Sequence, residues 1–209
     1  MDALNRALSK HKIVPVVKID DAENALPLAD ALVRGGLPVA EITFRTDAAE
    51  ESIRRISGGY PDMLLGAGTV VSVDQVKRAT DAGARFIVSA GFGREVVSYC
   101  ADKKIPVYPG VCTPSELLWL LEFDLKVAKF FPAEQYGGLA TIRALSAPFP
   151  QMMFMPTGGI SAENVREYLA FEKVVACGGS WMVKDTMIAD GEFAKIREFT
   201  SSAVRLVSQ

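Results

Sequence analysis

The sequence predicts an α/β protein, a (β/α)8 TIM barrel, in which residues 1–209 form a single domain with an N-terminal helix. The first observation is that short apolar runs alternate along the chain with longer amphipathic segments, as repeated βαβ units of a parallel sheet require. The second is that eight such units occupy 209 residues, the lower end of the size range of these barrels. The third is an apolar content of 49%, which suits strands that are covered on both faces.

The amphipathic segment "MDALNRALSKHK" predicts the N-terminal helix. Eight strands follow, each predicted from an apolar run, at residues 12–19, 39–44, 63–70, 85–90, 105–111, 126–132, 152–159 and 174–180. Helical segments separate the strands, and several begin near residues whose side chains cap helices, namely Asp47, Ser72, Thr113 and Ser161.

An open, doubly wound sheet with fewer strands is the alternative architecture. Such a sheet normally binds its ligand through a glycine-rich turn after the first strand. The first apolar run is instead followed by "DDAEN", which contains no glycine. The barrel is therefore the favoured prediction.

Composition argues against several classes of partner and site. The net charge of −2 provides no attraction for nucleic acid or for an anionic membrane, and no apolar run is long enough to span a bilayer or to form a signal region. The single histidine, His11, argues against a histidine-rich metal site, and three cysteines without CxxC spacing indicate reduced thiols. We therefore expect a cytoplasmic protein without a metal.

Strand alternation places a set of reactive side chains inside the predicted barrel. Successive side chains of a strand point to opposite faces, and the active groups of such barrels lie near the carboxyl ends of the strands. The inward series of "VAEITFR" contains Glu41 and Arg45, and that of "KVAKFFP" contains Lys129 and Phe131. Thr69, at the end of "LGAGT", adds a hydroxyl group.

Lys129 stands among apolar residues, although lysine is almost never buried without a partner. One interpretation is a buried ion pair with Glu41 that only fills space. The other is a Schiff-base lysine: desolvation and a neighbouring cation lower the pKa of its amine, which attacks a carbonyl while Glu41 carries protons. Lys18 is a rival amine, but Asp20 and Asp21 adjoin it, and we assign it a supporting or structural role.

Two glycine pairs predict a phosphate site, although such pairs also occur in ordinary turns. Gly158 and Gly159 end the seventh strand, and the glycine pair of "CGGS" (177–180), which Ser180 follows, ends the eighth. The loops after these two strands are where barrels hold phosphate, through bare backbone N–H groups. The two glycines of "GAGT" in the third strand are interpreted instead as room for a substrate close to the backbone.

The residues alone leave three functions open. The first is Schiff-base chemistry at Lys129, and the second is a phosphate-binding isomerase or epimerase that uses Glu41 as its base. The third is a non-catalytic sugar-phosphate binding protein. The complete set of inward polar groups argues against the third function, because buried polar groups destabilise a barrel that has no use for them.

Six motifs together carry a resemblance to one family. They occur in order along nearly the whole chain: "EITFRT", "GAGTV", "PGVCTPSE", "KFFPAE", "PTGGIS" and "GGSW". The sequence resembles the 2-keto-3-deoxy-6-phosphogluconate (KDPG) aldolases, some of which also act on 4-hydroxy-2-oxoglutarate (KHG). The resemblance implies a metal-free class I aldolase without a cofactor, a homotrimer, and a phosphorylated keto-acid substrate that is cleaved to pyruvate and glyceraldehyde 3-phosphate.

Carried over by position, the resemblance makes Lys129 the Schiff-base lysine and Glu41 the proton shuttle, with Arg45 and Thr69 on the substrate carboxylate. It places the hydroxyl and phosphate end of the substrate against Thr157, Gly158, Gly159, Gly179 and Ser180. The segment "SAGF" departs from the family pattern, because Ala90 stands where proline is usual. The preference among related acids, including the galactonate-derived epimer, therefore stays open.

Overall fold

The computed structural model describes residues 3–208, and its strands lie where the apolar runs predict them. They are β1 (Ile13–Val17), β2 (Val39–Thr43), β3 (Leu64–Gly68), β4 (Phe86–Val88), β5 (Val107–Tyr108), β6 (Gly110–Val111), β7 (Val127–Phe130), β8 (Met153–Pro156) and β9 (Cys177–Gly179). Every strand pair in the two sheets is parallel. The predicted α/β class with parallel strands is confirmed.

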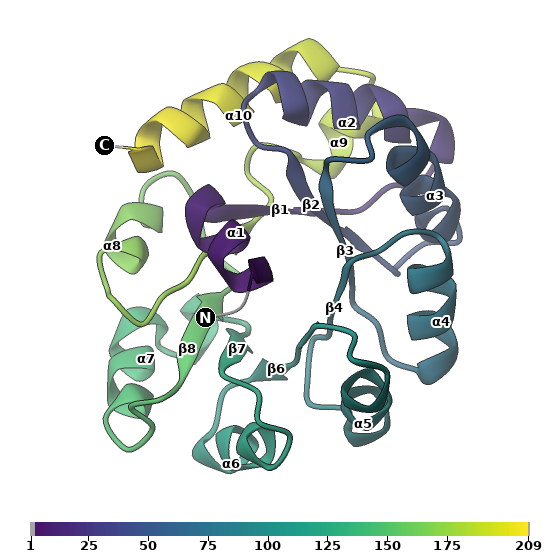
Figure 1. The fold of residues 1–209 in the computed structure, drawn as a ribbon. Coiled ribbons are helices and arrows are strands. Elements are labelled where there is room, and N and C mark those ends of the chain that lie inside the picture. The colour runs from purple at the N-terminus through teal and green to yellow at the C-terminus, as the bar shows by residue number, and fades with distance from the viewer. Residues whose placement is uncertain (1–2, 209) are drawn as a thin grey trace.

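Helices surround the strands in Figure 1, except for α1, which lies near the middle of the view. The helices are α1 (Ala3–His11), α2 (Ala25–Arg34), α3 (Ala49–Gly59), α4 (Val73–Asp81), α5 (Arg94–Lys103), α6 (Pro114–Glu122), α7 (Gly138–Ser146), α8 (Val165–Leu169), α9 (Asp185–Ala189) and α10 (Phe193–Ser208), with 3-10 turns η1 (Ala22–Asn24) and η2 (Glu134–Tyr136). Within residues 3–208, none of these helices has the length and apolar character needed to cross a membrane.

The strands pair as two parallel sheets. Six follow the order β5-β4-β3-β2-β1-β9, and three follow the order β6-β7-β8. Isolated bridges join Phe154 to Val174 and Thr157 to Gly178, and so connect β8 to β9 and the segment that leads into it. The last strand thus lies beside the first, whereas a doubly wound sheet reverses its strand order at a switch point. The strand order excludes the doubly wound alternative.

The prediction of one strand at residues 105–111 is wrong, because Pro109 divides this segment into β5 and β6. Proline has no N–H group to donate to a strand ladder. β5 pairs with β4, whereas β6 pairs with β7. The Pro109 carbonyl accepts a 3.0 Å hydrogen bond from the Lys129 N–H group. The two sheets therefore meet at this proline.

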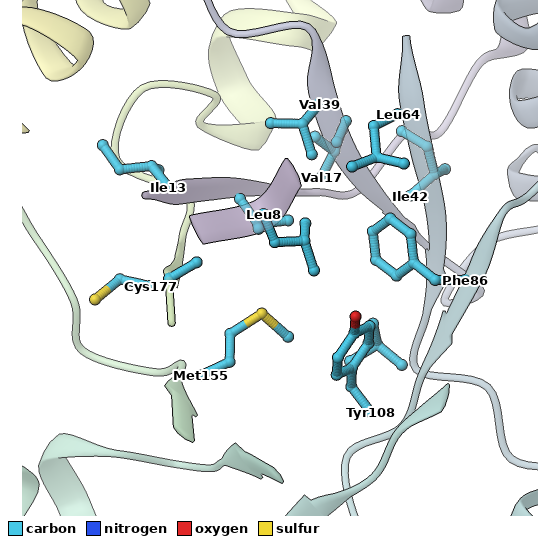
Figure 2. Packing of buried hydrophobic residues seen from close by; sticks show 14 of the residues in the cluster. Leu8, Ile13, Val17, Val39, Ile42, Leu64, Phe86, Tyr108, Met155 and Cys177 are labelled. Atoms are coloured by element: carbon cyan, nitrogen blue, oxygen red, sulfur yellow. The ribbon is translucent and has the colours of Figure 1, made fainter. Parts of the chain in front are cut away.

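Helix α1 packs its apolar face against the strands. Leu8 is fully buried in the cluster that Figure 2 shows, which also contains Phe86, Tyr108 and Met155. The Tyr108 ring meets the Phe86 ring edge-on, with 5.8 Å between the ring centroids. The Tyr108 hydroxyl donates a buried 2.8 Å hydrogen bond to the side-chain oxygen of Asn5. Apolar contacts and this hydrogen bond together hold α1 on the strands.

Capping chemistry sets two of the four predicted helix starts. Thr113 forms a capping box with Glu116 at the start of α6, and the Ser72 hydroxyl caps α4. The cap predicted at Asp47 is wrong, because a turn follows this residue and α3 begins at Ala49. The cap bonds predicted at Ser161 are present, since its N–H group donates to Asn164 Oδ1 at 2.9 Å and its hydroxyl accepts from the Glu163 N–H group at 3.3 Å. They close a turn, however, and α8 begins only at Val165.

Gly66 is required by the core. It lies beside Phe86 in the pairing of β3 with β4, and a Cβ atom at Gly66 would come within 2.1 Å of the Phe86 ring. Phe86 is fully buried, so the ring has no free space into which to move. The expectation that this glycine leaves room for a substrate is therefore wrong.

We expect Gly66→Ala to lower the free energy of unfolding by about 1–3 kcal/mol, because the added methyl group overpacks the core. Gly58→Ala is the matched control, since a Cβ atom at this exposed position of α3 meets nothing within 4 Å. Alanine there should stabilise the helix by about 0.5–1 kcal/mol. Urea unfolding of both variants measures the difference. Equal unfolding midpoints for Gly66→Ala and the wild type would contradict this account.

Candidate active site

A pocket of about 360 Å³ opens where the strands end, and it is lined by all ten residues that the sequence singles out. They are Glu41, Arg45, Thr69, Lys129, Phe131, Thr157, Gly158, Gly159, Gly179 and Ser180. A larger cavity of about 570 Å³ lies near the beginnings of β5, β7 and β8, where Asn5 and Val127 line it. None of the ten residues borders that cavity, so the smaller pocket is the candidate site.

Lys129 and Glu41 form a buried ion pair in this pocket. Lys129 lies in β7 and Glu41 in β2, and the distance from Lys129 Nζ to Glu41 Oε1 is 3.3 Å. Their side chains are 5% and 1% exposed. Neither charge is solvated, so each depends on the other for its stabilisation. The pairing that alternation predicts between these two strands is present in the structure.

The second carboxylate oxygen of Glu41 is an unused acceptor. Glu41 Oε2 is buried and has no hydrogen-bond partner among the described residues. An unpaired buried acceptor costs free energy, and a donor on a ligand in the pocket would remove that cost. Glu41 is therefore placed to accept a proton or a hydrogen bond from a ligand in the pocket.

Gly68 makes space for Glu41. A Cβ atom at Gly68 would lie 2.1 Å from Glu41 Oε1, and Gly68 itself does not line the pocket. Thr43 of β2 pairs with Gly68 of β3, so the carboxylate lies against the backbone of the neighbouring strand. The expectation that this second glycine of β3 gives room to a substrate is also wrong, because the glycine accommodates the catalytic candidate.

The Phe131 ring borders the amine of Lys129. Lys129 Nζ lies 5.1 Å from the ring centroid, within the range of a cation–π contact. Phe131 is half-buried and lines the pocket, as its inward position in the strand pattern predicts. The ring excludes water on one side of the amine and also stabilises its positive charge.

Arg45 stands at the exposed rim of the pocket and is fixed by a short chain of hydrogen bonds. Arg45 Nε donates to Thr43 Oγ1 at 3.1 Å, and the Thr43 hydroxyl donates to the Val17 carbonyl at 2.8 Å. Thr43 is not among the site residues predicted from the sequence. The same strand alternation that selects Glu41 and Arg45 nevertheless turns Thr43 inward. Within residues 3–208, the outer N–H groups of Arg45 have no hydrogen-bond partner, and their geometry suits a carboxylate.

Thr69 has an unusual backbone conformation. Its φ of 57° lies in the left-handed region, which residues with a branched Cβ rarely adopt. Such conformations occur mainly at binding and catalytic sites, where the surrounding structure imposes them. The backbone conformation of Thr69 is therefore imposed by its place in the pocket wall and not by the conformational preference of threonine.

The two glycine pairs meet on one side of the pocket. The bridge between Thr157 and Gly178 brings the ends of β8 and β9 together. Gly158 and Gly159 have φ values of 97° and 77°, which favour glycine. A Cβ atom at Gly179 would meet the Trp181 ring at 2.1 Å. These close contacts and backbone angles explain why glycine occupies the three positions. Because glycine has no side chain, the backbone there is open to the pocket.

Other candidate groups lie outside the chemistry. Lys18 forms an exposed 2.6 Å ion pair with Asp20 and does not line the pocket. Burial raises the pKa of the Cys177 thiol, and burial together with Glu116 raises the pKa of Cys112, so neither thiol is activated as a nucleophile. No cluster of metal-ligating side chains occurs within residues 3–208.

Six residues line the pocket in addition to the ten that the sequence predicts: Val16, Thr43, Ala90, Ile160, Gly178 and Asp185. Ala90 is the position at which the chain departs from the family pattern, and Gly178 belongs to the second glycine pair. Asp185 carried no signal in the sequence beyond its place at the start of the last helical segment. It lies at the first position of α9.

We expect Glu41→Leu to lower the free energy of unfolding by about 3–5 kcal/mol, because it leaves the Lys129 ammonium buried without a partner. Lys129→Met should also destabilise the protein, since it leaves the carboxylate alone. The double variant should recover much of the loss. Urea unfolding of the four proteins forms a complete double-mutant cycle. Additive losses in the double variant would show that the two groups do not stabilise each other.

Comparisons with known proteins agree with one another. The model of the KDPG and KHG aldolase family matches residues 4–199. The chain is 44% identical over 207 residues to a 2-dehydro-3-deoxy-phosphogluconate aldolase of Treponema pallidum, and the alignment covers 99% of each chain.

Two solved structures share the fold at substantial identity. One is a KDPG aldolase from Legionella pneumophila with pyruvate captured as a covalent carbinolamine intermediate, with a TM-score of 0.91, 39% identity, and coverage of 95% of this chain and 97% of that chain. The other is a KDPG aldolase of Zymomonas mobilis with 3-phosphoglycerate, with a TM-score of 0.87, 34% identity, and coverage of 95% and 94%.

Proposed function

Because the chain belongs to the KDPG and KHG aldolase family, we propose that it cleaves 2-dehydro-3-deoxy-6-phosphogluconate to pyruvate and glyceraldehyde 3-phosphate as a class I aldolase. The observation that carries this proposal is the buried pair of Lys129 and Glu41, with one carboxylate oxygen left unpaired. A purely structural ion pair needs no unpaired oxygen and no opening to a pocket.

Lys129 forms the covalent bond to the substrate. Its amine must lose a proton before it can add to the C2 ketone, and Glu41, 3.3 Å away, is the nearest base. Addition gives a carbinolamine. Glu41 then returns its proton to the departing hydroxyl group, so that loss of water gives an iminium ion and leaves Glu41 as a carboxylate. The carbinolamine of pyruvate in the Legionella pneumophila enzyme is the same type of intermediate.

The iminium ion allows the C3–C4 bond to break. It accepts the electron pair of that bond as an enamine, while Glu41 removes the proton of the C4 hydroxyl group directly or through a water molecule. Glyceraldehyde 3-phosphate then leaves. Protonation of the enamine at C3 and hydrolysis of the resulting imine release pyruvate and restore the free amine of Lys129.

The two ends of the substrate are held by different chemistry. Arg45 and Thr69 bind the carboxylate next to the ketone, and Phe131 forms an apolar wall beside it. The hydroxyl and phosphate groups lie against the loops after β8 and β9, where Thr157, Gly158, Gly159, Gly179 and Ser180 line the pocket. The Zymomonas mobilis structure with 3-phosphoglycerate supports a phosphate-bearing ligand for this family.

The same site also suits 4-hydroxy-2-oxoglutarate, which would give pyruvate and glyoxylate. This acid has the same 2-oxo and 4-hydroxy groups, so the roles of Lys129 and Glu41 do not change. The family description includes both substrates. The galactonate-derived epimer differs only at C4, and Ala90, which lines the pocket, bears on that choice.

We also infer that the two sheets form one (β/α)8 barrel and that residues 1–209 form a single aldolase domain. The pairing of β9 with β1 and the bridges between β8 and β9 support this inference. The contact of Pro109 with Lys129 joins the sheets on the other side. The cytoplasmic location stays a prediction from the cysteine content.

Borohydride reduction in the presence of pyruvate should inactivate the enzyme irreversibly, because it converts the imine to a stable secondary amine. Peptide mass spectrometry should find the added mass on Lys129. Lys129→Ala should abolish both trapping and turnover, whereas Lys18→Ala, which removes an amine outside the pocket, should leave both intact.

Two outcomes would count against this function. Trapping at a lysine other than Lys129 would refute the assignment of the residue. Turnover retained by Lys129→Arg would refute the covalent step, because a guanidinium keeps the charge but forms no imine at neutral pH. That second result would favour the isomerase or epimerase hypothesis, in which Glu41 acts alone as the base.

We expect a homotrimer in solution, as the resemblance implies. Exposed apolar residues on α6 support an interface, since Leu118 is 55% and Trp119 is 40% exposed. Sedimentation equilibrium should give three times the 22.6 kDa mass of one chain. Trp119→Glu should lower that mass, whereas Val71→Glu, at an exposed residue outside α6, should not. A monomeric wild type would contradict the expectation.

A further inference from the structure

The charges that line the pocket are unevenly distributed. Among the described residues, four charged side chains line it: Glu41, Arg45, Lys129 and Asp185. Both basic groups belong to the part assigned to the 2-oxo acid. On the side formed by the loops after β8 and β9, Asp185 is the one charged lining residue that the structure describes. The phosphate of the proposed substrate therefore meets backbone, the hydroxyl groups of Thr157 and Ser180, and a carboxylate, without a basic side chain among the described residues.

No neighbouring group neutralises Asp185. Within residues 3–208, its carboxylate forms no hydrogen bond and no ion pair, and the residue is exposed. The adjacent Lys184 lines a separate groove with Trp181 and Phe199. Glu134, an acid beside Gly159, accepts a hydrogen bond from the Tyr168 hydroxyl and does not line the pocket. The negative charge of Asp185 thus acts on the pocket without a local partner.

A carboxylate at this position discriminates between distal groups by charge. A phosphate ester carries a charge of about −1.5 to −2 at neutral pH, and like charges in a partly enclosed pocket repel each other. A hydroxyl group carries no charge and can donate a hydrogen bond to the carboxylate. Asp185 should therefore weaken the binding of a phosphorylated substrate more than that of an unphosphorylated one.

Building on the proposed function, we propose that Asp185 is a specificity-determining residue that reduces the preference of the enzyme for the phosphate ester. It shifts the substrate range toward 2-oxo acids whose distal end is hydroxylated and uncharged. The loops after β8 and β9 still bind phosphate through their backbone. The Asp185 carboxylate determines how much the phosphate group contributes to the affinity of the enzyme for its substrate.

Asp185 also has a structural role that the experiment must separate. An acidic residue in the first turn of a helix interacts favourably with the helix dipole, and Asp185 begins α9. A loss of that contact would lower stability and would change the kinetics of all substrates alike. The discriminating quantity is therefore the ratio of kcat/KM for two substrates that differ only in the phosphate group.

The test compares 2-dehydro-3-deoxy-6-phosphogluconate with unphosphorylated 2-dehydro-3-deoxygluconate for the wild type and two variants. Asp185→Asn should raise the ratio of kcat/KM by about three- to tenfold, and the increase should shrink in 1 M salt. Asp190→Asn is the matched control, because it removes the same charge from an exposed residue at the other end of α9 that does not line the pocket. Its ratio should stay within twofold of the wild type.

Calorimetric titration with inorganic phosphate provides a second readout that needs no turnover. Asp185→Asn should bind phosphate about three- to tenfold more tightly than the wild type, and Asp190→Asn should not. An unchanged ratio and unchanged phosphate affinity in Asp185→Asn would overturn the inference. A wild type that cleaves neither substrate would overturn the proposed function instead, and phosphate affinity alone would then decide the role of Asp185.

Discussion

The burial of one ammonium group against one carboxylate is the constraint on which the site depends. Lys129 and Glu41 are almost without solvent contact, so each would destabilise the fold in the absence of the other. The protein keeps both where apolar residues of similar size would serve stability as well. In the proposed mechanism, that arrangement holds the nucleophile and the base in contact before any substrate arrives, which removes the cost of bringing them together during the reaction.

Several local features follow from this pair. Gly68 lacks a side chain because the carboxylate occupies its space, and Phe131 places its ring beside the amine. Arg45, in contrast, lies at the exposed rim of the pocket, where Thr43 fixes its guanidinium. The pocket thus has a dry part around the ion pair and a more open part at its rim.

The sequence predicts the reactive core of the site well because strand periodicity is rigid. A period of two residues decides which side chains of β2 and β7 face inward, and it correctly brings Glu41, Lys129 and Phe131 together. The features that the sequence misassigns, such as the reason for Gly66 and Gly68, depend on contacts between neighbouring strands. The partners of Gly66 and Gly68 are a buried ring and a carboxylate from neighbouring strands, and Asp185 reaches the pocket only through the path of the chain after β9. The sequence shows a proline at position 109. That this proline divides the strand follows from the pairing of β5 with β4 and of β6 with β7, which the sequence alone does not reveal.

The reactive pair spans the seam between the two sheets, because Glu41 belongs to the six-stranded sheet and Lys129 to the three-stranded sheet. Close packing holds this seam at Pro109 and at Gly110, where a Cβ atom would come within 2.1 Å of the Ala90 carbonyl. A small rotation of one sheet against the other would therefore change the distance between amine and carboxylate directly. The alignment of the amine with the carboxylate is a property of how the two sheets are joined, as much as of the two side chains themselves.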